Sequence, residues 1–112
     1  MRYTVYIHEQ AKQDIRRNAT WWAENHSSSQ ADRWFHTAFD EIERLVNMPE
    51  SHPLAAEHGD FSFELRELQF GFGSRPGFRA LFVIRNDTVH VLAVRRAAQD
   101  RFMRGSLPVD FE

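Results

Sequence analysis

Two amphipathic helical patterns, separated only by a short polar break, constrain the fold of this chain more than any other feature of its sequence. Apolar residues recur at spacings of three and four over residues 9–25 and again over residues 30–47, which predicts two helices with one apolar stripe each. The stripes consist of Ala11, Ile15, Ala19 and Trp22 in the first helix and of Ala31, Trp34, Phe35, Ala38, Ile42, Leu45 and Val46 in the second. Asp14 and Arg17 lie off the first stripe. Such a pair forms an antiparallel hairpin, and its stripes must be buried against another layer.

Strands on both sides of the hairpin in sequence are predicted to supply that layer. Alternating apolar residues and enrichment in Val, Ile and Phe indicate four strands. We expect them at residues 2–8, 61–70, 78–85 and 88–94, with a tight turn at Asn86-Asp87 and a connecting turn at 71–77. A change of apolar parity between Leu65 and Leu68 indicates a bulge in the second strand.

The predicted fold is therefore α+β, in the order strand, helix, helix, strand, strand, strand. The last three strands form an antiparallel meander, and the first strand joins the edge or the centre of this small, mostly antiparallel sheet. The helical hairpin packs on one face of the sheet. We expect the other face to be partly open and to collect the arginines of the strands.

Length and composition narrow the class of protein. A chain of 112 residues is expected to be one domain, with a core at residues 1–104 and a tail at 105–112. It has no cysteine, which excludes disulfides and a thiolate nucleophile. Neither the spacing of its histidines nor its glycines match a metal or phosphate motif, so no metal or cofactor is expected. The lack of a long apolar run or a signal peptide predicts a cytoplasmic protein without membrane association.

Charge is distributed unevenly along the chain. Residues 1–65 carry 6 basic and 11 acidic side chains, a net charge of -5. Residues 66–104 carry 8 arginines and 3 acidic side chains, a net charge of +5. This asymmetry predicts an anionic partner, either a nucleic acid or an acidic protein segment. The alternative is that these arginines pair internally with acidic residues of the same chain.

Three segments resemble a known family when they are taken together. They are the opening VYIHEQAKQDI, the run WFHTAFDEIERLVNMP, and the end RELQFGFGSRPGFRALFVIRNDTVHVLAVRRAAQD. In this order they resemble the RelE/ParE superfamily of bacterial toxins from type II toxin–antitoxin modules, also called plasmid stabilisation proteins, over about residues 3–101. The resemblance implies a small toxin neutralised by a cognate antitoxin, whose C-terminal segment wraps over the helices and sheet of the toxin.

Members of this superfamily have two different activities. RelE-like toxins cut mRNA in the ribosomal A site, whereas ParE-like toxins bind DNA gyrase and trap its cleaved complex without chemistry of their own. An inactive homologue that only binds its antitoxin is a third alternative. Whether this chain is an enzyme therefore depends on whether it holds the groups that RNA cleavage needs.

Cleavage of RNA without a metal requires a base, an acid and cations that stabilise the phosphorane-like transition state. The resemblance assigns Arg79, in GFRALFVI, to the arginine of the third strand of the family, and Arg66 and Arg96 could add positive charge. Nuclease members place a His, Tyr or Lys shortly after the last strand or in the loop before it. The residues after Val94 are Arg-Arg-Ala-Ala, which transfer protons poorly at neutral pH. The ParE-like activity is therefore favoured.

Other polar residues are weaker candidates for the acid and the base. They are His58, Glu64, Glu67, His90 and Asp100. All of these except His58 have a structural alternative: His90 as a strand residue satisfied by one neighbour, the two glutamates as partners of Arg66 or Arg79, and Asp100 as a cap or a partner of Arg96. The residues predicted to bind the target or the antitoxin are Arg66, Arg79, Arg95, Arg96 and Arg101. An exposed member of the pair Trp21 and Trp22 could help to dock the antitoxin.

Overall fold

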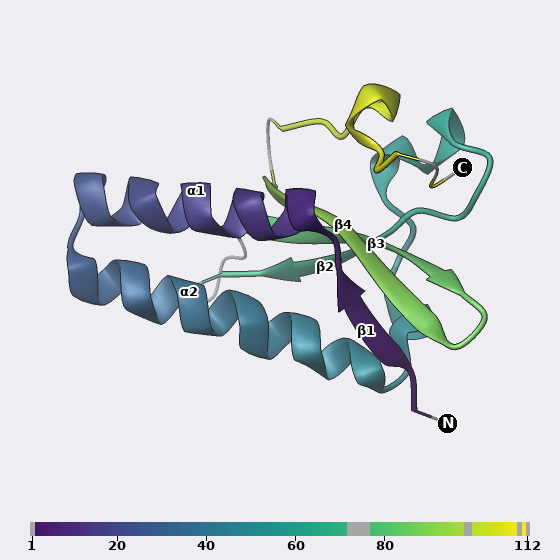
Figure 1. Cartoon of the computed structure of the whole chain (residues 1–112), viewed down its shortest axis with the longest axis horizontal. Helices are drawn as coiled ribbons and strands as arrows, with labels where there is room; N and C mark the ends of the chain where they lie inside the picture. Colours follow the sequence, from purple (N-terminus) through teal and green to yellow (C-terminus); the bar gives the residue numbers. More distant parts are fainter. Residues whose placement is uncertain (1, 72–76, 98–99, 110, 112) are drawn as a thin grey trace.

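The computed structural model describes residues 2–71, 77–97, 100–109 and 111, and its elements follow the predicted order (Figure 1). The helices and strands are β1 (Thr4–Ile7), α1 (Glu9–Asn25), α2 (Ser28–Glu43), β2 (Arg66–Phe70), β3 (Phe78–Arg85) and β4 (Thr88–Arg96). Most of the predicted connecting turn at 71–77 and two residues of the expected tail lie outside the described residues. The predicted α+β fold is confirmed.

The four strands form one mixed sheet in the order β1-β4-β3-β2. The first strand lies at the edge, parallel to β4, and the other neighbours are antiparallel. The predicted meander is therefore confirmed. The register shifts between Leu81 and Phe82, which pair with Ala93 and Val91, so Leu92 is the extra residue of a bulge. The bulge was expected in the second strand, but it lies between the last two.

The two helices pack against one face of the sheet, as Figure 1 shows. Their apolar stripes meet the inward side chains of the strands, and Trp34 lies at the centre with its ring 5.0 Å from that of Phe78. The second helix begins after Ser27, whose hydroxyl oxygen accepts a hydrogen bond from the backbone N–H of Gln30, so the polar break between the stripes also caps the next helix. No helix in the described part of the chain combines the length and apolarity that a membrane span needs.

The second face of the sheet is also covered, contrary to the expectation of a partly open face. A second apolar cluster, with Phe102 and Phe111 at 0% and 5% exposure, lies against it. Its other members are Ala55, Leu65, Leu81, Val83, Leu92 and Ala93, with Phe61, Phe63 and Leu107 at its border. The covering layer therefore comes from the loop before β2 and from the C-terminal segment, and Phe111, in the expected tail, is part of it.

The second strand is shorter than predicted. It begins at Arg66 rather than at residue 61, because the preceding residues turn to place Phe61 and Phe63 in the second cluster. The backbone N–H of Ala55 donates to the carbonyl of Leu65, and that of Glu67 donates to the carbonyl of Pro53. These bonds hold the loop against the outer edge of β2.

The turn between β3 and β4 supports a first prediction. Asn86 has a φ of 57°, a left-handed conformation that asparagine tolerates better than alanine does. We expect Asn86→Ala to lower the free energy of unfolding by about 1 kcal/mol, because alanine strains this backbone. The measurement is urea unfolding followed by circular dichroism. Asn86→Gly is the control and should stay within about 0.5 kcal/mol of the parent, since glycine adopts this φ without strain. Equal stability of both variants would contradict the prediction.

Candidate functional site

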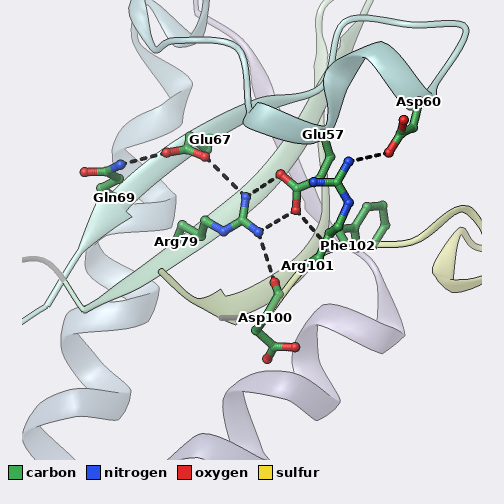
Figure 2. Close-up of polar contacts among 8 residues, drawn as sticks. All are labelled: Glu57, Asp60, Glu67, Gln69, Arg79, Asp100, Arg101 and Phe102. Atoms are coloured by element: carbon green, nitrogen blue, oxygen red, sulfur yellow. Dashed lines mark hydrogen bonds and ion pairs between the residues drawn. The ribbon is translucent and has the colours of Figure 1, made fainter. Parts of the chain in front are cut away.

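Arg79 lies at the centre of a buried polar cluster on the second face of the sheet (Figure 2). Its guanidinium donates from Nη1 and Nη2 to the two carboxylate oxygens of Glu57, at 2.7 and 2.5 Å. Nη1 also lies 3.3 Å from a carboxylate oxygen of Glu67, and Nη2 lies 3.0 Å from the backbone carbonyl oxygen of Asp100. Arg79 is 6% exposed and Glu57 is 1% exposed. Both Nη groups of Arg79 are therefore engaged inside the protein, whereas its buried Nε has no hydrogen-bond partner among the described residues.

Loops bring the partners of Arg79 to it. Glu57 belongs to a short 3₁₀ turn, Ala56–Asp60, in the loop before β2, and its carboxylate also accepts a hydrogen bond from the backbone N–H of Phe102 at 2.8 Å. Residues that follow β4 therefore approach the cluster from the opposite side. The carboxylate of Glu57 thus links β3, the loop before β2 and the C-terminal segment.

The two charges of this ion pair stabilise each other. Burial alone would raise the pKa of Glu57, but the hydrogen bonds that it accepts from Arg79 and Phe102 lower it to about 2. The hydrogen bond to Glu57 raises the pKa of Arg79 in turn. Both side chains thus stay ionised at physiological pH.

A shallow pocket of about 340 Å³ borders the cluster. Its lining contains three acidic residues, Glu57, Glu67 and Asp100, and two arginines, Arg79 and Arg101. At the surface, Arg101 pairs with Asp60 at 2.6 Å. The charge of this pocket is therefore negative overall. A phosphate group would find neither a free cation at Arg79 nor a favourable potential.

Arg66 and the two predicted glutamates, Glu64 and Glu67, also form internal pairs. Arg66 donates to the backbone carbonyl of His52 at 2.7 Å and to the carboxylate of Glu64 at 3.1 Å. The expected partnerships of Glu64 with Arg66 and of Glu67 with Arg79 are confirmed. His58 lies exposed on the 3₁₀ turn, and Asp100 joins the Arg79 cluster through its backbone carbonyl.

His90 faces a second histidine across the sheet. Its Nδ1 lies 2.9 Å from Nε2 of His8, which follows β1, so one hydrogen bond joins the two rings. Burial lowers the pKa of His8, and His90 adds to this effect; burial also lowers the pKa of His90, and the charge of Arg85 adds to it. The expectation that one neighbour satisfies His90 is confirmed. Arg85 itself stacks on the ring of Phe111 at 3.8 Å.

A third polar group joins α1 to the end of β4. The carboxylate of Asp14 is fully buried and accepts hydrogen bonds from Arg17 at 2.5 Å, from the backbone N–H of Val94 at 3.0 Å and from Arg95 at 3.3 Å. The guanidinium of Arg96 lies over the ring of Trp21, 4.3 Å from its centre. We call Arg17, Trp21, Arg95 and Arg96 the α1–β4 surface.

Sequence reasoning missed two central residues of these groups. Asp14 was placed off the apolar stripe, but it lies three residues after Ala11 and beside Ile15, both fully buried. A short acidic side chain at such a position is a signal for a buried polar contact. Glu57 has no comparable signal, because it lies in an irregular loop. Among the described residues, no three His, Asp or Glu side chains group closely enough to hold a metal ion.

The structure is that of a small α+β domain in which the strand arginines are used largely for internal pairing. A family model described as the ParE toxin of the type II toxin–antitoxin system parDE matches residues 5–101. The chain therefore belongs to the ParE toxin family.

A solved structure supports this assignment at the level of the fold. The chain resembles a chain of the chromosomal ParDE toxin–antitoxin system from P. aeruginosa with a TM-score of 0.68 and 13% sequence identity. The alignment covers 85% of this chain and 96% of the other. No protein of curated function matches the sequence significantly.

Proposed function

We propose that this ParE toxin acts on DNA gyrase by binding it, without chemistry of its own. The observation that carries the proposal is the state of Arg79, the residue that a nuclease of this superfamily would use to hold phosphate. Its guanidinium is bound by the carboxylates of Glu57 and Glu67 and is 6% exposed. Membership of the ParE family supports the same activity.

The other candidates for RNA cleavage do not complete a site around Arg79. Cleavage needs an acid, a base and cations within reach of one phosphate. The histidine pair, His8 and His90, packs against Phe111, with both rings within 5.6 Å of that ring by their centres. The nearby cation, Arg85, is stacked on Phe111 and donates to its carbonyl oxygen. This arrangement supports a structural role for the pair.

The cognate antitoxin of this ParE toxin is expected to contact the exposed arginines. Of the five arginines predicted to bind a partner, Arg96 and Arg101 are exposed, whereas Arg66, Arg79 and Arg95 are largely covered by internal contacts. We therefore assign antitoxin binding to Arg96 and Arg101 rather than to the whole set.

The test is an assay with purified gyrase. We expect the chain to inhibit supercoiling and to increase gyrase-dependent DNA cleavage, because it stabilises the cleaved complex. The cognate antitoxin should reverse both effects, and relaxation of the same plasmid by topoisomerase I should be unchanged.

A parallel assay with programmed ribosomes distinguishes the alternatives. Cleavage of mRNA within codons, with gyrase unaffected, would establish the RelE-like activity instead. If neither target responds and cells that express the chain grow normally, the chain is an inactive homologue and the proposal is wrong.

A further inference from the structure

The α1–β4 surface carries a charge that its own contacts do not balance. Arg17 and Arg95 share the carboxylate of Asp14, and Arg96, the next residue of β4, lies over the ring of Trp21 on α1. The other arginines predicted to bind a partner are Arg66, Arg79 and Arg101. Each of them has a carboxylate of its own within 3.3 Å. Three arginines and one carboxylate therefore leave a local surplus of positive charge where α1 meets the end of β4.

Asp14 is shared too widely to neutralise its neighbours. Its two carboxylate oxygens accept hydrogen bonds from Arg17, Arg95 and the backbone N–H of Val94, and the amide of Gln10 donates to it at 3.1 Å. A single negative charge is thus divided between two guanidinium groups. The side chain of Arg17 is 62% exposed, so part of its positive charge faces the solvent.

Arg96 is held in a way that leaves its N–H groups available. The contacts described for its guanidinium are with ring faces, Trp21 at 4.3 Å and Phe78 at 5.9 Å. Such stacking uses the flat face of the group and keeps its N–H edge free for a planar or bidentate anion. Trp21 lies beside it and is itself partly exposed.

The helix on the other side of the hairpin has the opposite charge. The exposed acidic residues of α2 are Asp32, Asp40 and Glu43, and its one basic residue is Arg33. A polyanion is therefore repelled from α2 and attracted to the α1–β4 surface, which orients the molecule on approach.

We propose that the α1–β4 surface binds the phosphate backbone of DNA, and that the toxin contacts DNA in this way while it is bound to gyrase. The second part rests on the proposed function. Arginine pairs with phosphate through two parallel hydrogen bonds, which the free N–H edge of Arg96 can supply. An acidic protein segment would match the arginines alone. The proposed function places the bound toxin beside the DNA that gyrase cleaves, and this favours a nucleic acid.

The direct test uses a short DNA duplex as the probe and the fluorescence of tryptophan as the signal. We expect the duplex to quench the fluorescence, with an affinity that falls with salt at a logarithmic slope of about -2, because Arg17 and Arg96 contact about two phosphates. Arg96→Gln should weaken binding several-fold and reduce the slope by about one.

A matched control removes the same charge from α1, at a position outside the α1–β4 surface. Arg16 precedes Arg17 and pairs with Glu9, and it points about 100° away around α1. Arg16→Gln should therefore change the affinity much less than Arg96→Gln does. Thermal unfolding of both variants checks that each is folded.

Three results would overturn the proposal. They are the absence of quenching by the duplex at low salt, an equal effect of the Arg16 and Arg96 variants, and binding of a glutamate-rich peptide of equal charge as tightly as the duplex. The last result would assign the surface to an acidic protein segment.

A gyrase assay separates this inference from the proposed function. We expect Arg96→Gln to be captured by gyrase in the absence of DNA like the parent, yet to yield less cleaved DNA. If the parent chain is not captured by gyrase, the proposed function fails, whereas the duplex titration still decides whether this surface binds DNA. If gyrase captures both proteins and both yield equal cleavage, the toxin does not contact DNA through this surface in the complex.

Discussion

Glu57→Gln is expected to lower the free energy of unfolding by about 3–5 kcal/mol, because it leaves the guanidinium of Arg79 buried without its main counter-charge. Arg79 is 6% exposed, and its remaining carboxylate contact, with Glu67, is 3.3 Å long. The amide also presents one acceptor where the carboxylate presents two, so a hydrogen bond to Arg79 or to Phe102 is lost. The measurement is urea unfolding at neutral pH.

The same ion pair predicts how stability changes with acid. The pKa of Glu57 is lowered from 4.5 to about 2 in the folded protein, a difference that corresponds to roughly 3 kcal/mol. The unfolded chain therefore takes up a proton on this residue first as the pH falls. The stabilisation is complete above about pH 4.5 and is lost as the pH falls through about 2. The Glu57→Gln variant has no carboxylate to protonate at this position. The difference in the free energy of unfolding between the parent and this variant should therefore shrink as the pH falls from about 4.5 to about 2.

Glu64→Gln is the matched control, since Glu64 also pairs with an arginine of the sheet but its side chain is 71% exposed. It should cost less than about 1 kcal/mol. A similar cost for the Glu57 and Glu64 variants would contradict the structural role of the buried pair. A second variant, Glu57→Leu with Arg79→Met, removes both charges and is expected to recover much of the lost stability, as apolar replacements of buried ion pairs often do.

The parts of the fold that sequence could predict are those whose patterns are local. The apolar stripe of α1 repeats every three or four residues, and its bounds, Glu9–Asn25, match the predicted range. Asn86 and the flanking strands likewise signal the last hairpin, which the structure confirms at β3 and β4. In these elements each residue's neighbours in space are also its neighbours in sequence, so periodicity is sufficient.

The parts that sequence could not predict depend on contacts between distant segments. Arg79 meets Glu57 across 22 residues, and His90 meets His8 across 82 residues. Neither pair leaves a periodic pattern. The covering layer of the second sheet face comes from an irregular loop and from Phe102 and Phe111, which lie beyond the family match at residues 5–101. The candidate site therefore changed most: its arginines and their neighbouring glutamates, Glu64 and Glu67, could be identified, but the distant partners Glu57 and Asp14 could not.

Asp14→Ala is expected to lower the free energy of unfolding by about 3 kcal/mol, although alanine has a higher helix propensity than aspartate. The carboxylate is fully buried, and its loss leaves the backbone N–H of Val94 and the guanidinium of Arg95 without their acceptor. These bonds join α1 to β4 across 80 residues. Hydrogen exchange at the Val94 amide should accelerate together with the fall in stability measured by urea unfolding. Asp32→Ala, at an exposed position of α2, is the control and should change stability by less than about 0.5 kcal/mol.

The proposed DNA contact gives Asp14 a second, opposite effect. Asp14→Asn keeps an oxygen that can accept from Val94 but removes the one negative charge among Arg17, Arg95 and Arg96. We expect it to cost less stability than Asp14→Ala and to bind the DNA duplex several-fold more tightly than the parent, with a steeper dependence on salt. A general loosening of the fold would weaken binding instead. A variant that is less stable and also binds DNA less tightly would therefore show that Asp14 acts on this surface only by maintaining its structure.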